Sequence, residues 1–173
     1  MNTPMMSLAA INAMSAAEFV AAFGGVAEHS AWVAEKAASA RPFATRGAMI
    51  EAFQNAIGDA GAGAQRDLLN AHPDLAGRAA IVGHLTEDSR REQTGAGLDR
   101  LTPEEFGRFT ILNDAYREKF GIPFIFAVRG ADKHQILAAF EARIGNAADV
   151  EFATALSQVC RIVAFRLEDR VVA

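Results

Sequence analysis

The sequence lacks the features that mark several classes of protein. Its 173 residues include one cysteine, Cys160, so no intrachain disulfide can form. No apolar run approaches the ~18 residues of a membrane-spanning helix. The N-terminal stretch has no basic region before its apolar part, so we expect neither a membrane partner nor a signal peptide. Acidic residues outnumber basic ones by 21 to 17, which counts against a nucleic-acid partner. A cytoplasmic protein is the expectation.

The motifs of metal and phosphate sites are missing as well. The four histidines, His29, His72, His84 and His134, are scattered, and none has a second ligand at the spacing of motifs such as HExxH, so no metal site is predicted. The glycine-rich stretch "GDAGAGAQ" has neither a preceding strand nor the lysine of a phosphate-binding loop. Any catalytic group is therefore expected to work without a metal or a phosphate loop.

What the sequence does contain is a succession of helix start and stop signals. Ser15 with Glu18, and Thr102 with Glu105, have the spacing of capping boxes, and Pro103 suits the first turn of the second helix. Between such signals, apolar residues recur at helical spacing. The pattern predicts an all-α protein, a single compact helical domain over residues 1–173 with about eight to ten helices.

Three stretches carry more specific expectations. An alanine-rich helix is expected from about Val26 to Ala40. The run Gly58–Ala64, "GDAGAGA", is expected to be a flexible joint. Ile122–Val128 is the one strongly β-like run, and it has no second strand to pair with. We therefore expect a buried extended segment between helices.

A histidine stands at a break between two helices. In "NAHPDLAGR", Pro73 disfavours a helical backbone at His72, so a short helix must end near Ala71. The imidazole at such a break can face a cavity and take part in catalysis. It can equally lie at the C-terminal end of the preceding helix and interact favourably with the helix dipole. The motif alone leaves both possibilities open.

Two further segments hold candidate polar groups. Ser89 and Glu92 in "EDSRREQTGAG" have the spacing of another capping box, and with Gln93 they can instead present hydroxyl, carboxylate and amide groups to a small polar ligand. Arg166 lies four residues after Ile162, toward the apolar face of the last helix, so it needs a carboxylate partner. That partner is either a structural ion pair or the carboxylate of a substrate.

Four segments together resemble one family, the 2-oxo-4-hydroxy-4-carboxy-5-ureidoimidazoline (OHCU) decarboxylases of purine breakdown. They are "NAHPDLAGR", "TEDSRREQTGAGLDRL", "FTILNDAYREKFGIPFIFAVRG" and "RIVAFRLEDR", and the likeness runs from about Met14 to Val171. The resemblance implies an all-helical carboxy-lyase that converts OHCU, formed from urate, into (S)-allantoin and CO2 without a cofactor, commonly as a homodimer. The alternatives are a non-catalytic helical ligand-sensing or dimerisation module, and a lyase for another small ureido acid.

The resemblance also implies site residues. His72 would be the catalytic proton donor, Glu92 would hold the substrate hydroxyl or fix the His72 tautomer, and Arg166 would bind the substrate or hold Glu92 in place. The implied substrate-binding set is Pro73, Ser89, Arg90, Arg91, Glu92, Gln93, Phe124, Ile125, Phe126, Ala127 and Val128. Phe126 is larger than the side chain that family members often carry at this position. No metal ligand is implied.

Overall fold

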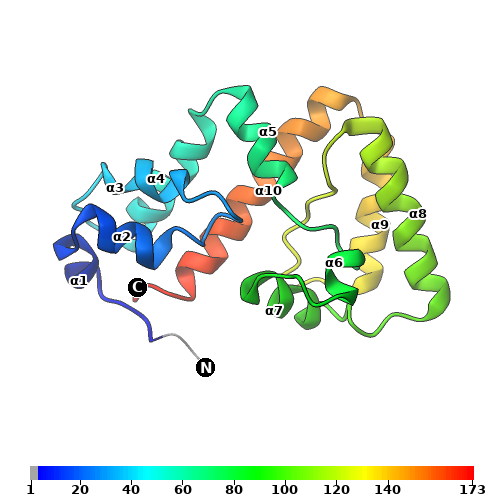
Figure 1. The fold of residues 1–173 in the computed structure, drawn as a ribbon, viewed down its shortest axis with the longest axis horizontal. Coiled ribbons are helices and arrows are strands. Elements are labelled where there is room, and N and C mark those ends of the chain that lie inside the picture. Colours follow the sequence, from blue (N-terminus) through cyan, green and yellow to red (C-terminus); the bar gives the residue numbers. More distant parts are fainter. Residues whose placement is uncertain (1–3) are drawn as a thin grey trace. The chain divides into compact units, whose positions relative to one another are not determined.

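The computed structural model describes residues 4–173, which form α-helices and no β-strand (Figure 1). The helices are α1 (Leu8–Ala13), α2 (Ala16–Phe23), α3 (Trp32–Ala38), α4 (Arg46–Gly58), α5 (Ala62–Asn70), α6 (Arg78–Ile81), α7 (Glu87–Gly95), α8 (Pro103–Phe120), α9 (Lys133–Arg143) and α10 (Ala148–Glu168). One isolated parallel bridge joins Met6 to Val171. The ten helices of the described residues confirm the predicted all-α class and helix number.

The described chain folds as two units. The first consists of residues 4–71 and 159–173, and the second of residues 72–158. The long helix α10 therefore supplies its first part to the second unit and its last part to the first. Each unit buries apolar side chains of its own. The single domain expected over residues 1–173 stays a prediction.

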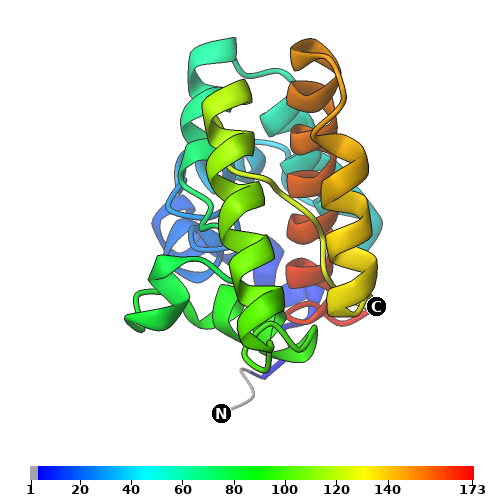
Figure 2. The same ribbon diagram turned by 90° about the vertical axis from the view of Figure 1, so that its right-hand side faces the viewer.

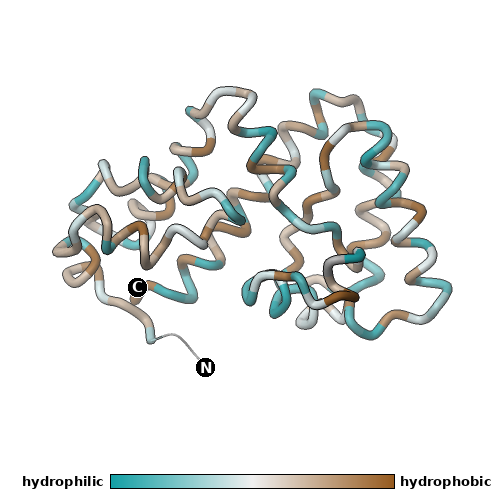
Figure 3. The backbone as a smooth tube through the Cα atoms, in the orientation of Figure 1, coloured by the Kyte–Doolittle hydropathy of each residue, from teal (hydrophilic) through white to brown (hydrophobic). Residues whose placement is uncertain are grey.

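In the first unit, α2, α3 and α4 pack together and enclose aromatic side chains. Phe19 lies among three other buried rings, with ring centroids 5.0 Å from Phe23, 6.1 Å from Phe43 and 6.1 Å from Phe53. Figure 3 shows hydrophobic and hydrophilic residues alternating along these helices. This alternation is typical of helices that bury one face and expose the other.

In the second unit, α8 and α9 lie side by side and run in the same direction (Figures 1 and 2). Lys119, near the end of α8, donates hydrogen bonds to the carbonyls of Ile144 and Asn146, just beyond the end of α9, at 2.7 and 3.0 Å. A chain that leaves one helix must return along its length before it can begin a parallel neighbour. The segment Ile122–Val128 makes this return, and six of its seven residues are buried, which confirms the predicted buried extended segment.

Helix α8 begins and ends at the residues that the sequence predicts. The Thr102 hydroxyl accepts a hydrogen bond from the Glu105 N–H at 3.2 Å, and the Glu105 carboxylate accepts one from the Thr102 N–H at 2.9 Å. Pro103 occupies the first turn. Gly121 ends the helix with a φ of 68°, in the left-handed region that glycine adopts without strain. The capping box predicted at Ser15 also forms.

Two helix boundaries differ from expectation, and α1 was not predicted. α3 begins at Trp32 instead of near Val26, because the preceding turn contains His29 with a φ of 45°, which an α-helix cannot contain. The joint expected at Gly58–Ala64 is shorter, since α4 and α5 leave only residues 59–61 between them. The alanines at the start of α5 favour helix and offset the glycines.

A buried polar network joins three helices of the second unit. Glu151 of α10 is fully buried, and its carboxylate accepts hydrogen bonds from Arg143 of α9 at 2.9 to 3.2 Å, from Asn146 at 2.9 Å and from the Tyr116 hydroxyl of α8. Burial alone would raise the pKa of Glu151, but these hydrogen bonds outweigh it and hold that pKa below its usual range. Burial, followed by the bond to Glu151, raises the pKa of Tyr116. The folded protein therefore holds Glu151 ionised and Tyr116 protonated.

The variant Glu151→Gln tests how much this network stabilises the fold. The amide keeps the shape of the side chain but leaves the Arg143 guanidinium without its counter-charge. We expect the free energy of unfolding at pH about 7 to fall by about 3–5 kcal/mol, measured by urea unfolding with circular dichroism. Glu141→Gln is the control, because its carboxylate pairs with Arg108 at the surface and the expected change is below about 1 kcal/mol.

The loss of stability in Glu151→Gln should become smaller as the pH falls. Because folding lowers the pKa of Glu151, its carboxylate stabilises the folded state above the ordinary value of 4.5, and this contribution disappears as the pH falls through the lowered pKa. The difference in unfolding free energy between the wild type and Glu151→Gln should therefore narrow between pH about 5 and about 3. A difference that stays constant over this range would contradict the ionised state of Glu151.

Candidate functional site

His72 lies directly after the end of α5, as the sequence predicts. The helix ends at Asn70, its C-cap is Ala71, and His72 is only 6% exposed. Pro73 has no backbone N–H and restricts the residue before it, so the helix cannot continue. The break therefore leaves a buried histidine at the start of a loop.

The loop that begins with His72, residues 72–77, is bound to α7 by Gln93. The side-chain oxygen of Gln93 accepts a hydrogen bond from the Ala76 N–H at 3.0 Å, and its nitrogen donates to the Asp74 carbonyl at 3.3 Å. Ala76 has a φ of 52°, in the left-handed region that residues other than glycine rarely adopt. Gln93 thus supports a strained backbone and holds α7 against the loop that carries His72.

Two residues of α8 hold the same loop. The Asn113 side chain donates to the Leu75 carbonyl at 2.9 Å, and the Arg117 guanidinium donates to the Asp74 carboxylate at 3.0 Å. Asn113 is buried, and its side-chain oxygen has no hydrogen-bond partner among the described residues. A buried acceptor without a partner costs about 1–3 kcal/mol. Asn113 and Arg117 together fix the loop against α8.

α7 places the residues of the predicted Ser-x-x-Glu-Gln motif on one face. The N-cap of the helix is Thr86, whose hydroxyl accepts a hydrogen bond from the Ser89 N–H at 3.3 Å, so the capping box predicted at Ser89 is wrong. Threonine is also a favoured N-cap, and the two acidic residues that follow Thr86 in the first turn favour a helix start there. Ser89, Glu92 and Gln93 are therefore separated by three and four helical positions. Ser89 and Gln93 are buried, and Glu92 is half-buried.

Arg90 and Arg91 lie on the exposed side of α7. Arg90 pairs with Glu87 at 2.5 Å, and Arg91 pairs with Asp88 at 2.7 Å, each one helical turn away. More than half of each arginine side chain is exposed, so these pairs contribute little to stability. The predicted part of both arginines in substrate binding stays a prediction.

The segment predicted to line the pocket, residues 124–128, has no neighbouring strand within the described part of the chain. Four of its five residues are buried. The Ile125 carbonyl accepts a hydrogen bond from Arg143 at 2.7 Å, and the Ala127 N–H donates to the side-chain oxygen of Gln158 at 2.9 Å. Side chains of α9 and α10 thus bind backbone groups that a sheet would otherwise have satisfied.

Arg166 has the carboxylate partner that its buried position requires. In the first unit, its guanidinium lies 2.9 Å from the Glu28 carboxylate, and the two side chains are 3% and 2% exposed. The exposed His29, with its φ of 45°, follows, and the Ser30 hydroxyl donates to the Glu28 carbonyl at 2.8 Å. This turn directs Glu28 inward. The structural ion pair is therefore present, and a contact of Arg166 with substrate or with Glu92 stays a prediction.

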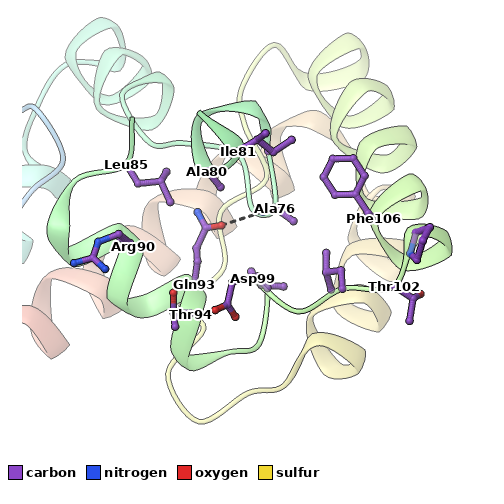
Figure 4. Close-up of a pocket in the computed structure, with 14 residues that line it drawn as sticks. Ala76, Ala80, Ile81, Leu85, Arg90, Gln93, Thr94, Asp99, Thr102 and Phe106 are labelled. Carbon is purple, nitrogen blue, oxygen red and sulfur yellow. Dashed lines mark hydrogen bonds between the residues drawn. The ribbon is translucent and has the colours of Figure 1, made fainter. Parts of the chain in front are cut away.

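The second unit contains a cavity of about 550 Å³ beside the His72 loop (Figure 4). Ala76 of the loop, α6, α7 and the start of α8 with Phe106 contribute to its lining. Among the described lining residues, Arg90 and Gln93 belong to the predicted site. In Figure 4 the side-chain oxygen of Gln93 points to Ala76 along their hydrogen bond. A volume of this size suits a small organic molecule.

No group of three or more histidine, cysteine, aspartate or glutamate side chains within residues 4–173 comes together in a way that could hold a metal ion. Over the same range, no helix is both long and apolar enough to cross a membrane.

Sequence reasoning missed the residues that hold the predicted groups in place. These are Glu28 beside Arg166, Asn113 at the His72 loop, and Arg143 and Gln158 at the extended segment. A buried arginine indicates that an acidic residue lies beside it. The chain has 21 acidic residues, so the sequence does not identify which of them is the partner. The other three bind backbone atoms, and such contacts leave no spacing pattern in a sequence.

The comparisons with known proteins agree with one another. The family model OHCU decarboxylase matches residues 12–168. The 2-oxo-4-hydroxy-4-carboxy-5-ureidoimidazoline decarboxylase of Haloferax volcanii is 41% identical over 95% of this chain and 96% of the relative. That of Halalkalicoccus jeotgali is 43% identical over 94% and 90%. The crystal structure of (S)-allantoin synthase matches with a TM-score of 0.76 and 31% identity over 96% of this chain and 54% of the solved one, so this chain spans about half of that protein.

Variants of Glu28 and Arg166 measure the ion pair of the first unit. Glu28→Gln or Arg166→Met alone leaves a buried charge without this partner, so each should lower the free energy of unfolding by about 3–5 kcal/mol. The double variant should lose less than the sum of the two, and urea unfolding of the four proteins gives the coupling energy. Arg108→Met and Glu141→Gln form the control cycle at an exposed pair, where coupling should stay below about 1 kcal/mol. Strictly additive losses at Glu28 and Arg166 would refute the pairing.

Proposed function

This chain belongs to the OHCU decarboxylase family, and on that premise we propose that it converts OHCU into (S)-allantoin and CO2 in the degradation of urate. It is a carboxy-lyase. The family match over residues 12–168 is the observation that carries this function, and it confirms the decarboxylase predicted from the sequence. The relatives do not support the alternative of a non-catalytic helical module.

The substrate supplies its own electron sink. Its carboxylate is attached to a carbon that bears a hydroxyl and lies next to a ring C=N bond. When the bond to the carboxylate breaks, the electron pair moves toward this C=N bond, whose nitrogen accepts it, and an enamine results. The nitrogen takes up a proton. A second proton added to the former C=N carbon, which bears the ureido group, gives allantoin as the hydroxyl loses its own proton and becomes the ring carbonyl. The protein has to orient the carboxylate out of the ring plane, stabilise the developing charge and deliver one proton to one face.

In this proposal His72 delivers the proton, because an imidazole can act as a general acid near neutral pH. Its support is structural: His72 is buried, and Gln93 and Asn113 hold the loop that follows it. A fixed loop lets an imidazole approach the substrate from one direction. Glu92, on the helix that Gln93 joins to this loop, holds the substrate hydroxyl or fixes the His72 tautomer.

The other predicted residues take supporting roles. Ser89, Pro73 and the backbone of residues 124–128 contact the substrate, whose ureido and ring amides match neutral donors and acceptors. Gln93 contributes by holding the His72 loop, since both polar atoms of its amide bind that loop. Arg166 binds the anionic substrate or holds Glu92. Very tight binding of the substrate carboxylate would stabilise the ground state and oppose its loss.

A cytoplasmic homodimer belongs to the same proposal. Ile81, Val82 and Phe106 are large hydrophobic side chains that the second unit exposes, and Ile81 and Phe106 line one cavity. A second copy of the chain would cover such a surface. Light scattering in solution should therefore give twice the chain mass of 18.4 kDa. A monomer at every concentration would exclude the dimer but not the activity.

The variant His72→Asn tests the proposed catalysis. Asparagine keeps a polar side chain but has no titrating proton, so the enzymatic rate should fall by about 10²- to 10⁴-fold while the protein still folds. Urate, urate oxidase and hydroxyisourate hydrolase supply fresh OHCU, and circular dichroism follows the formation of one allantoin enantiomer. His84→Asn, at an exposed histidine of the same unit, should behave as the wild type. Normal turnover by His72→Asn would remove His72 from the mechanism.

A further inference from the structure

Two side chains hold the extended segment along one side of its backbone. Arg143 donates a hydrogen bond to the Ile125 carbonyl at 2.7 Å, and the side-chain oxygen of Gln158 accepts one from the Ala127 N–H at 2.9 Å. In an extended chain, the backbone groups of residues two positions apart point to the same side. Arg143 and Gln158 therefore fix one and the same side of the segment.

The opposite side carries the backbone N–H and C=O of Phe126. Within the described residues, no protein hydrogen bond involves either of these two groups. Phe126 is half-buried, and backbone groups that no protein group meets pair with solvent or with a ligand. One donor and one acceptor on the same residue match a neutral amide, and the ring and ureido groups of the substrate are of this kind.

Arg143 is itself held in one orientation. Its guanidinium lies 2.9 Å from the carboxylate of the fully buried Glu151, to which Tyr116 and Asn146 also donate hydrogen bonds. It also lies 4.4 Å above the centre of the Phe124 ring. Only 12% of the Arg143 side chain is exposed. Residues of α8, α9 and α10 thus combine to place one guanidinium on one carbonyl of the segment.

We propose that Arg143 and Gln158 are positioning residues for the decarboxylation. By holding the backbone of Ile125 and Ala127, they set the N–H and C=O of Phe126 toward the substrate amides. The inference rests on the proposed function, in which the substrate lies against residues 124–128. Neither side chain contacts the substrate. Because a misplacement of about 1 Å can lower a rate by about 10²-fold, the loss of either hydrogen bond should impair catalysis more than stability.

Variants at Gln158 separate an effect on catalysis from an effect on stability. Gln158→Leu removes the acceptor of the Ala127 N–H, and kcat/KM for OHCU should fall about 10- to 100-fold, mainly through KM. Gln158→Glu keeps an oxygen at the same place and should restore most of the activity. Gln54→Leu is the matched control, since Gln54 binds the Cys160 carbonyl at 3.3 Å in the first unit, and it should keep the kinetics of the wild type.

Arg143→Lys gives a second, independent test. Lysine keeps a positive charge beside Glu151 but lacks the planar fork that reaches the Glu151 carboxylate and the Ile125 carbonyl together. The variant should therefore keep its fold and still show a raised KM. Thermal unfolding is measured for every variant, and rates are expressed per folded molecule.

The outcomes separate this inference from the proposed function. If the wild type does not decarboxylate OHCU, the proposed function fails. If the wild type is active but Gln158→Leu and Arg143→Lys lose only thermal stability, as Gln54→Leu does, the positioning role is overturned and the function stands. Equal losses of activity in Gln158→Leu and Gln158→Glu would also count against it, because the acceptor oxygen would then be irrelevant.

A further test uses the wild-type protein alone and follows ligand binding by NMR. The product (S)-allantoin is titrated into ¹⁵N-labelled protein, and the backbone amide signals of residues 124–128 are followed. The Phe126 amide should shift most, and the Ala127 amide, already bound to Gln158, should shift least. The reverse order, or no shift in this segment at saturating allantoin, would overturn the inference.

Discussion

The pairing of Arg143 with Glu151 is the interaction on which the second unit depends. Two parallel helices, α8 and α9, can be neighbours only if the chain between them returns in extended form. A buried extended chain without a sheet needs partners for its backbone, and Arg143 gives one to Ile125. A buried guanidinium is stable only beside a carboxylate, so Glu151 makes the arrangement possible. The extended connection that the parallel helices require is thereby held in place by α9 and α10.

The loop after His72 follows the same rule with uncharged groups. Gln93 and Asn113 bind its backbone with amide side chains, and Gln93 supports Ala76 in a conformation that an alanine does not adopt unaided. In both places a side chain from a helix holds the backbone of a non-helical segment. The helices thus act as fixed supports, and two of the segments between them, the His72 loop and residues 124–128, carry groups that we propose meet the substrate.

This division suits a reaction in which the substrate provides the electron sink. The barrier is then lowered by geometry: the carboxylate has to stand out of the ring plane, and the proton has to come from one side. Such a reaction needs few reactive side chains, but it depends strongly on where they are positioned. The buried networks of this protein, Tyr116–Glu151–Arg143 and Arg166–Glu28, are of the kind that restricts motion, because each charged group has its hydrogen-bonding partner within the folded chain.

The sequence by itself determined the features that depend on neighbours along the chain. The Thr102 capping box, the stop at Gly121 and the break before Pro73 are local, because each follows from the backbone preferences of a few residues. Even locally the prediction was wrong where two residues that can cap a helix lie three positions apart, as Thr86 and Ser89 do. The order of four motifs also gave the family. Only the tertiary structure decided the partners of the buried polar groups, because hydrogen bonds between residues far apart in the chain depend on where the helices pack, and no spacing in the sequence encodes that distance.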